Sequence, residues 1–457
     1  MIGIILCGGY GKKIWPYSDW WQKCCIPIGN RPNVARVAGQ LRDAGLTRIY
    51  AVTGYNSQMV RYALRDEPGV VVLEGHPGIG TASSALSCAD GLGEDMLVIY
   101  GDAVVHEDDV ASVVRKFSET GHPVALTETL GEKERSLDWI CAMVDDDRIQ
   151  AIYGHPRSHY VNARVGGVFA LPKDAIRYLA ANPGHMENVC VGGMPPKESQ
   201  LEQSVQMMIE DGHPVVSVEA RRPVVDIDKP WHIWEANVVA AAEALSSIDE
   251  SFVGEGASID SSADIRGRVR LGRGSKIGRN VIIKGDVFIG DDVLVDSGAI
   301  IEDNVMIGDR SALTDYCMIG SGSVIGRANR IGYNAQFQGV TFDNVSMVHN
   351  CEIYGVVGSH TDIAAGCLVG SLRFDDTGTV HTIEGRKENA GVFANAAFIG
   401  DHTRTGVGNI FFPGVKVGVN CAIYPGVVVD SDVPSNSLLS VEQSRTLKRW
   451  GPEKYGW

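Results

Sequence analysis

The chain has 457 residues, of which 44% are hydrophobic and 21% are charged, as is typical of a soluble globular protein with two or three domains. A formal net charge of −15 argues against nucleic acid or an anionic membrane as a partner. No apolar run approaches the roughly 18 residues of a membrane span, and Met1 leads directly into an apolar strand, so neither a span nor a signal peptide is expected.

The first predicted element is a buried strand, Ile2–Cys7, which leads into a glycine-rich loop. Three glycines and two lysines follow the strand: Gly8, Gly9, Gly11, Lys13 and Lys23. Because glycine has no Cβ, backbone N–H groups can approach a phosphate closely, and lysines on the same loop supply positive charge. The pattern favours a phosphate-binding loop, and a glycine turn with solvated lysines is the alternative interpretation.

Residues 1–245 alternate apolar strands with helical patterns. Strands are predicted at Ile2–Cys7, Arg48–Thr53, Val70–Leu73, Met96–Tyr100 and Val124–Thr127, and helices at Val34–Ala44, Ser57–Arg65, Thr81–Leu92 and Asp109–Thr120. This alternation predicts βαβ crossovers and a doubly wound, Rossmann-like α/β domain with a mostly parallel sheet. Such sheets bind ligands at the carboxyl ends of their strands. The opening loop and the residues after Tyr100 are therefore expected at the same edge.

From Phe252 the pattern changes to a period of six residues. Fourteen successive positions of this repeat are aliphatic: Val253, Ile259, Ile265, Leu271, Ile277, Ile283, Ile289, Val295, Ile301, Ile307, Leu313, Ile319, Ile325 and Ile331. A six-residue period with one inward aliphatic side chain per repeat predicts a left-handed parallel β-helix over residues 251–435. The repeat shifts phase near Gln336–Ser346 and stops at the loop Ser371–Asn395. Interruptions of this kind are expected where a function or an interface breaks the coil.

Residues 436–457 form a predicted C-terminal tail that carries Trp450, Tyr455 and Trp457. We expect this tail to fold back onto a neighbouring chain as a short helix or cap. The ten cysteines have no C-x-x-C pairs or metal-ligand spacing, which favours reduced, buried thiols in a cytoplasmic protein.

The opening loop resembles the signature of the nucleoside-triphosphate: sugar-1-phosphate nucleotidylyltransferases, which reads L-x-G-G-x-G-x-R, then a proline, P-K and P-I. The matching residues are Leu6, Gly8, Gly9, Gly11, Pro16, Lys23, Pro27 and Ile28. Lys13 stands where the family has arginine, and Gln22 where it has the proline before its lysine. The resemblance implies that Leu6 and the glycines bind nucleotide and that Lys13 and Lys23 are catalytic. Lys13 keeps the charge without the planar fork of arginine.

The resemblance also implies two metal-binding carboxylates. Asp102 follows Gly101 in the family's G-D pair after a strand, and Asp226 precedes a P-W helix that matches the family motif. Nucleotidyl transfer builds negative charge, so Mg²⁺ bound by Asp102 and Asp226 is expected as cofactor. Asp228 would either share the metal or cap the helix that begins near Pro230.

The specificity positions depart from the family pattern. Gly80 and Thr81 keep the family's G-T pair, but the base-reading glutamine falls on Gly75, next to Glu74. A carboxylate only accepts hydrogen bonds, so Glu74 would suit the N–H donors of guanine or cytosine, which predicts GTP or CTP as the nucleotide. The alternative is that Glu74 only ends a strand and does not contact the base.

The acceptor motifs differ further from those of the family. His155 stands where the family has the lysine of E-K-P, and Gly167 lies in its altered N-A-G motif. His155 would contact phosphate when protonated, or it would be an inert turn residue. An unusual sugar phosphate, a cyclitol phosphate or another phosphorylated alcohol is therefore expected as acceptor.

The whole layout resembles the bifunctional sugar-1-phosphate nucleotidylyltransferase/acetyltransferases, which implies a homotrimer. The second active site is altered, because Ser371 replaces the catalytic asparagine of N-L-R-F-D. Three histidines lie nearby as candidate bases: His349, His360 and His381. We expect a nucleotidyltransferase whose β-helix serves assembly. A live acyltransferase site, or a non-catalytic nucleotide-binding scaffold, are the alternatives.

Overall fold

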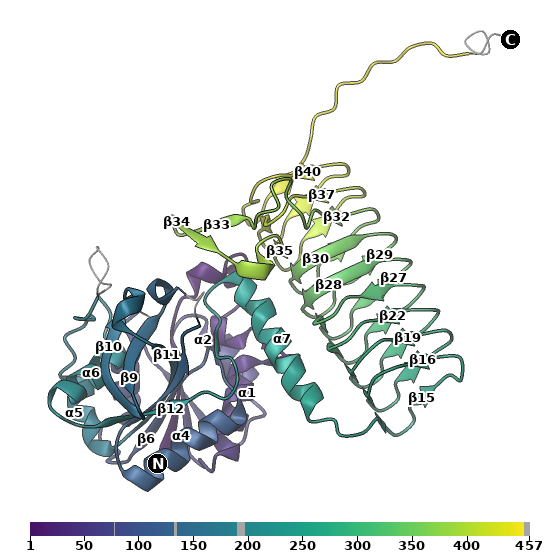
Figure 1. Cartoon of the computed structure of the whole chain (residues 1–457). Coiled ribbons are helices and arrows are strands. Elements are labelled where there is room, and N and C mark those ends of the chain that lie inside the picture. Colours follow the sequence, from purple (N-terminus) through teal and green to yellow (C-terminus); the bar gives the residue numbers. More distant parts are fainter. Residues whose placement is uncertain (77, 132–134, 190–196, 452–457) are drawn as a thin grey trace.

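The computed structural model describes residues 1–76, 78–131, 135–189 and 197–451. It consists of an amino-terminal α/β unit and a parallel β-helix, with a long helix between them (Figure 1). None of the described helices is long and apolar enough to span a membrane.

The α/β unit is built on a nine-stranded sheet with the order β5-β4-β1-β6-β11-β8-β12-β10-β9. Its strands are β1 (Ile2–Cys7), β4 (Ile49–Thr53), β5 (Val70–Glu74), β6 (Met96–Tyr100), β8 (Val124–Thr129), β9 (Ile140–Asp145), β10 (Arg148–Gly154), β11 (Ala163–Leu171) and β12 (Val215–Glu219). The pairs β5–β4, β4–β1, β1–β6 and β8–β12 are parallel, whereas β11 and β10 run against their neighbours. The α/β fold predicted from the sequence is confirmed, but the sheet is mixed and not mostly parallel, because four of its eight described neighbouring strand pairs are antiparallel.

Helices pack on the sheet because its strands are apolar on both faces. The described α-helices are α1 (Asn33–Asp43), α2 (Ser57–Ala63), α3 (Thr81–Ala89), α4 (Glu107–Thr120), α5 (Ile176–Ala180), α6 (Leu201–Glu210) and α7 (Pro230–Ser246). One buried cluster joins one face of the sheet to α1, α2 and α4, and a second joins the other face to α3, α5 and α6. Strand β1 contributes to both clusters, since all six of its residues are buried.

The chain reverses its direction of winding at β1. After β1 it adds β4 and β5 on one side, and then crosses to place β6 on the other side. The loops that leave β1 and β6 therefore diverge from adjacent strand ends, which is where doubly wound sheets bind ligands. The backbone N–H of Gly101 donates to the Leu6 carbonyl oxygen at 3.0 Å, so the two loops start in contact.

The β-helix stacks its strands at an offset of eighteen residues. In the first coil, β14 (Phe252–Val253), β15 (Ser258–Ile259) and β16 (Asp264–Ile265) each pair in parallel with the strand one coil further on, for example Phe252 with Arg270. The repeat aliphatics from Leu271 to Ile331 are buried in one continuous core. Val253 and Ile259 are 48% and 41% exposed, because the first coil has a neighbour on one side only. The parallel β-helix predicted from the repeat is confirmed.

The phase shift predicted near Gln336–Ser346 is a shortening of the coil. Strand β28 (Gln336–Thr341) pairs with β30 (Glu352–Val357) at an offset of sixteen residues, two fewer than before. Gly339 and Gly355 stack at the shortened corner with φ of 142° and 153°. A Cβ on Gly339 would overlap the carbonyl oxygen of Gly355, so only glycine fits there.

The segment between Ser371 and Asn395 leaves the coil and contacts the α/β unit. It forms a hairpin of β33 (Val380–Ile383) and β34 (Arg386–Asn389), followed by a short 3₁₀ turn (Gly391–Phe393). The ring of Phe393 lies 5.0 Å from that of Trp234 on α7. A carboxylate oxygen of Glu388 lies 3.9 Å from Lys229 Nζ.

Helix α7 joins the two units into one packed body (Figure 1). A buried cluster includes Trp231 and Trp234 of α7, Tyr17 of the opening loop, and Phe342 and Val356 of the β-helix. The chain passes from one unit to the other near the predicted boundary at residues 245–251, but the two units pack against each other through this shared cluster.

The described part of the tail lacks the predicted short helix, whereas its contact with a neighbouring chain stays a prediction. Residues 441–451 contain no helix and extend away from the last coil in Figure 1, whereas Tyr455 and Trp457 lie outside the described residues. A polar segment with Arg445, Lys448 and Arg449 around few apolar residues has little to bury against its own chain. The described cysteines are buried and form no disulfide with one another, as predicted.

Candidate active site

A cavity of about 390 Å³ opens where the loops after β1 and β6 diverge. Its walls come from the opening loop, the segment before α3, the end of β6 and the segment before α7. Predicted site residues that line it are Leu6, Gly8, Gly9, Lys13, Lys23, Gly80, Thr81, Asp102, His155 and Asp226. Segments far apart in the chain thus meet at the predicted edge of the sheet.

Lys23 occupies the centre of a charged cluster in this cavity. Its Nζ lies 2.6 Å from Asp102 Oδ2, 3.4 Å from Asp228 Oδ1 and 3.5 Å from Asp226 Oδ1. Burial disfavours the charged lysine, but the three carboxylates outweigh burial and hold the pKa of Lys23 well above its usual value. Lys23 is therefore a permanent cation at the point where the acidic residues converge.

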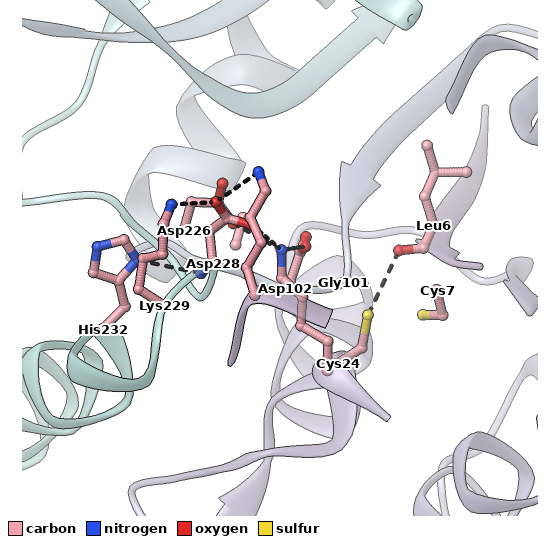
Figure 2. Close-up of polar contacts among 12 residues, drawn as sticks. Leu6, Cys7, Cys24, Gly101, Asp102, Asp226, Asp228, Lys229 and His232 are labelled. Carbon is pink, nitrogen blue, oxygen red and sulfur yellow. Dashed lines mark hydrogen bonds and ion pairs between the residues drawn. The ribbon is translucent and has the colours of Figure 1, made fainter. Parts of the chain in front are cut away.

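Two short paired strands, β7 (Ala103–Val104) and β13 (Val225–Asp226), position the acidic residues: Asp102 directly precedes β7, Asp226 ends β13, and Asp228 follows two residues later. Asp226 pairs with Ala103 in this ladder, which places it next to Asp102 (Figure 2). The side-chain amide of Asn33 fixes the turn by donating to the carbonyl oxygens of Gly101 and Ala103, at 2.8 and 3.0 Å. Gly101 supports the site from behind, since a Cβ there would lie 2.7 Å from Cys7 Sγ.

Asp226 and Asp228 differ in their electrostatic setting. Burial raises the pKa of Asp226 to about 6; Lys23 opposes this rise, whereas the charges of Asp102 and Asp228 add to it. Burial acts on Asp228 in the same direction, but Lys23, Lys13 and Lys229 outweigh it and hold the pKa of Asp228 below its usual value. Asp228 binds Lys229 Nζ at 2.8 Å and Lys13 Nζ at 3.2 Å, so it is already paired within the chain.

The segment around Asp228 is also fixed by His232 in the first turn of α7. The backbone N–H of Asp228 donates to His232 Nδ1 at 3.2 Å (Figure 2). Burial lowers the pKa of His232 to about 3, so its ring is neutral and can accept this bond. Lysines thus hold the side chain of Asp228, and His232 holds its backbone. The N-cap residue of α7 is Lys229, so the helix cap considered for Asp228 is not found, and its sharing of the metal stays a prediction.

The glycines of the opening loop make room for Lys23. Gly11 has φ of 62°, and a Cβ there would lie 3.0 Å from the Lys23 Cβ. Gln22, which replaces the family's proline, is fully buried and donates from Nε2 to the Cys7 carbonyl oxygen at 2.7 Å. Its Oε1 accepts from the backbone N–H of Cys24. From the sequence, Gln22 stands out only because it differs from the family's proline. In the structure, its side chain connects the turn that carries Lys23 to the end of β1.

The opposite wall joins Gly80 and Thr81 to the segment before α6. Gly80 has φ of 95°, and a Cβ there would overlap the backbone of Ser199. Thr81 Oγ1 accepts from the backbone N–H of Leu201 at 2.7 Å, and Tyr100 Oη donates to Glu202 Oε1 at 2.7 Å. The sequence offered no motif for Glu202, because its neighbours along the chain do not predict that it faces Tyr100.

Besides Gly11 and Gly101, which support the site from outside the cavity lining, two further predicted residues do not line the cavity. Glu74, at the end of β5, is exposed and binds Ser57 Oγ at 3.0 Å and Arg61 Nη2 at 3.2 Å, so the structure does not bring it to the cavity. Gly167 lies behind the wall, where a Cβ would be 3.1 Å from the Tyr100 ring. Glu74 follows the register of β5 against β4, which turns its side chain toward α2.

His155 lines the cavity as predicted, but its expected protonation is not supported. It adopts φ of 50°, and Nδ1 lies 3.0 Å from the Leu137 carbonyl oxygen. Burial lowers the pKa of His155, which favours the neutral ring. Beside it Trp139, which the sequence analysis did not single out, has the His232 ring stacked at 5.9 Å and the Arg164 guanidinium 4.9 Å from its centroid.

The site combines a glycine loop at the end of an apolar strand with fixed cations and a group of carboxylates. This combination suits the binding of a nucleoside triphosphate and a substitution reaction at one of its phosphorus atoms. Fold and site together define the chain as a nucleotidyltransferase. Residues 3–227 match the model of the MobA-like NTP transferase domain.

Curated relatives extend the similarity along the chain. The bifunctional protein GlmU of Methanocaldococcus jannaschii is 26% identical over 449 residues, covering 96% of this chain and 97% of the relative. A bifunctional sugar-1-phosphate nucleotidylyltransferase/acetyltransferase of Sulfurisphaera tokodaii is 25% identical over 445 residues, covering 96% of this chain and all of the relative. Among solved structures, a UTP-bound UGPase from Acinetobacter baumannii aligns with 53% of this chain and 93% of its own, at 16% identity and a TM-score of 0.44.

Proposed function

We propose that this protein transfers a nucleotidyl group from a nucleoside triphosphate to a phosphorylated sugar or sugar-like acceptor and releases pyrophosphate. The observation that carries the proposal is the position of Lys23, which meets Asp102, Asp226 and Asp228 beside the glycine loop. The full-length relatives named as sugar-1-phosphate nucleotidylyltransferases support the acceptor class.

Each residue has a role that its position supports. The backbone of Gly8 and Gly9 faces the cavity and would cradle the phosphates. Lys23 would bind the α-phosphate of the NTP while an oxygen of the acceptor phosphate attacks it and pyrophosphate leaves. The half-exposed Lys13 would bind the leaving pyrophosphate. The two ammonium groups are in the site before substrate binds, so they would stabilise the negative charge that develops in the transition state.

The donor set fits Mg²⁺, because Asp102 and Asp226 offer carboxylate oxygens. Among the described residues, no group of three or more acidic, histidine or cysteine side chains could hold a metal ion without other ligands. Phosphate oxygens and water would therefore complete the shell. When bound, Mg²⁺ would stabilise negative charge on the phosphoryl oxygens.

The acceptor end of the cavity supports an unusual substrate. The family's glutamate and lysine are replaced, and the wall here consists of Asp138, Trp139 and the neutral His155. Asp138 can accept hydrogen bonds from hydroxyl groups, as a cyclitol or sugar would offer. For the base, Glu74 gives no support to guanine or cytosine, since its carboxylate pairs with Arg61 outside the cavity.

For the assembly we propose a homotrimer formed through the β-helix. The support is a group of exposed apolar side chains on neighbouring coils and the inserted loop: Leu372, Phe374, Ile410 and Phe412. They line an open apolar groove of about 370 Å³. Side-by-side packing of coils would cover this surface.

The acyltransferase alternative is favoured by the bifunctional names of the full-length relatives. The β-helix carries a groove of about 440 Å³ lined by Gln336, Gln338, Tyr354, Ser371 and Asn395. None of the three candidate histidines lines it in the described part of the chain, and His381 is buried against the Ala394 carbonyl oxygen. Within a single chain, none of the histidines proposed as the base for acyl transfer therefore reaches this groove.

The test is pyrophosphate release from each of the four NTPs with Mg²⁺ and a panel of sugar, amino-sugar and cyclitol phosphates. We expect turnover with one base and a narrow acceptor class, and no release without acceptor. Failure of every combination would reject transferase activity in favour of a nucleotide-binding scaffold. Acetyl-CoA consumption with an amino-sugar phosphate would instead establish the second activity.

A further inference from the structure

The segment before the catalytic lysine is anchored to the β-helix as well as to the end of β1. Tyr17 Oη donates to the Val356 carbonyl oxygen at 2.8 Å, and Trp21 Nε1 donates to Asp401 Oδ1 at 2.9 Å. The Trp21 ring also meets Phe342 edge to face at 5.4 Å. All three contacts join the opening loop to coils more than three hundred residues further along the chain.

Asp401 is an unusual partner for this loop because it is a fully buried carboxylate. It follows β35 (Ala397–Ile399), and its Oδ1 also accepts from the backbone N–H of Ser359 at 2.9 Å. Its Oδ2 has no hydrogen-bond partner among the described residues. Gly358 leaves room for the carboxylate, since a Cβ there would lie 2.7 Å from Oδ2. Burial of a carboxylate is costly, so its retention calls for a specific role.

The route from Asp401 to the active site is short. Trp21 is followed by Gln22, whose buried amide ties the turn to the end of β1, and then by Lys23. Lys23 Nζ must stay close to Asp102 while its backbone fits beside Gly11. With Trp21 fixed on one side and the Cys7 carbonyl oxygen on the other, the lysine has little freedom to move.

We propose that Asp401 is a positioning residue for nucleotidyl transfer: through Trp21 it holds the lysine turn from the β-helix, so the β-helix forms part of the transferase active site. The inference rests on the proposed function of the α/β unit. It assigns to the β-helix a catalytic contribution that needs neither acyl transfer nor contact with substrate.

The first test compares steady-state kinetics of the wild type with those of Asp401→Ala, Asp401→Asn and Trp21→Phe. Asp401→Ala and Trp21→Phe each remove the bond, so we expect kcat to fall roughly tenfold while KM for the NTP changes little. Asp401→Asn keeps an oxygen acceptor for Trp21 and should recover most of the rate. Trp21→Phe keeps the ring against Phe342, so it provides a second variant if Asp401→Ala does not fold.

Thr403→Val is the matched control. Thr403 is equally buried two residues away, and its Oγ1 donates to the Gly418 carbonyl oxygen at 3.0 Å without touching the opening loop. This variant loses one buried hydrogen bond of the same coil and should lower Tm while kcat stays unchanged. Equal falls in kcat for Thr403→Val and Asp401→Ala would overturn the positioning role, because general weakening of the coil would then explain both.

Hydrogen exchange measured by mass spectrometry separates this inference from the proposed function. We expect faster exchange of the backbone amides of residues 18–25 in Asp401→Ala and in Trp21→Phe, and wild-type exchange there in Thr403→Val. If the wild type releases no pyrophosphate but this exchange pattern holds, the proposed activity fails and the anchoring stands. Unchanged exchange in Asp401→Ala refutes the anchoring even if the enzyme is active.

Discussion

The ammonium group of Lys23 lies 2.6 Å from a carboxylate oxygen of Asp102, in an ion pair that joins the loop after β1 to the turn after β6. The two strands are neighbours in the sheet, so their loops would meet even if neither side chain were charged. The charges turn this meeting point into a site, because they place a fixed cation beside oxygen donors in a partly buried cavity.

Asp102→Asn should reduce pyrophosphate release by about 100-fold or more, because the variant removes a charge beside the reacting phosphate while keeping the size of the side chain. Thermal unfolding should change little. Asp66→Asn is the control, since Asp66 is 81% exposed in the same unit. Wild-type turnover in Asp102→Asn would remove this residue from the active site.

Lys23→Met and Lys13→Met should affect different kinetic constants. Lys23 is buried among three carboxylates, so its loss should lower kcat by at least about 100-fold and also lower Tm through repulsion among them. The Lys13 side chain is 49% exposed and binds Asp228 alone, so its loss should mainly raise KM for the NTP. Kinetics and thermal unfolding of both variants test this contrast; indistinguishable kinetics would contradict the assigned roles.

His381 should make the protein less stable as the pH falls. Burial, reinforced by Lys416, lowers the pKa of His381 to about 4, below the value near 6.5 of an unfolded histidine. The unfolded chain therefore takes up the proton first, so the full stability present above pH 6.5 is lost as pH falls toward 4. The loss is about 3 kcal/mol.

Urea unfolding between pH 4 and 7 measures this slope, and His381→Gln should flatten it. His122→Gln, which changes an exposed histidine, should leave the slope as in the wild type. An unaltered slope in His381→Gln would show that other groups dominate in this window.

Asp401 should act with the opposite sign. Burial raises its pKa to about 6, above the value near 3.9 of an unfolded aspartate, so the folded protein holds this proton more tightly. Its contribution to stability is greatest below about pH 4 and falls by about 3 kcal/mol as pH rises through 6.

The stability of Asp401→Asn relative to the wild type should therefore increase from pH 4 to 6 and then level off. Burial and the charge of Asp401 also raise the pKa of Tyr17, but to a range above this window. The same urea titrations supply the measurement. A constant difference across the range would mean that Asp401 keeps an ordinary pKa.

Much of the architecture could be predicted because it depends on local patterns. The strand Ile2–Cys7 and the strand Met96–Tyr100 were predicted with their observed bounds, since an apolar run between breakers has few alternatives. The short helix predicted for the tail is absent from residues 441–451, because this polar segment has few apolar residues to pack as a helix against its own chain. Glu74 follows a motif one place out of register, and only strand pairing decides which way its side chain turns.

The sequence by itself determined the two folds, the glycine loop and the identity of the lysine and the aspartates, because periodicity and motif spacing are properties of neighbours along the chain. Only the tertiary structure decided that Asp228 completes the ring of charges around Lys23, that Gln22 fixes the lysine turn and that Asp401 reaches it through Trp21. The first two contacts lie within the α/β unit and depend on how its loops pack together. The bond between Trp21 and Asp401 joins the two units and depends on how α7 and the inserted hairpin pack one unit against the other. No local pattern encodes that packing.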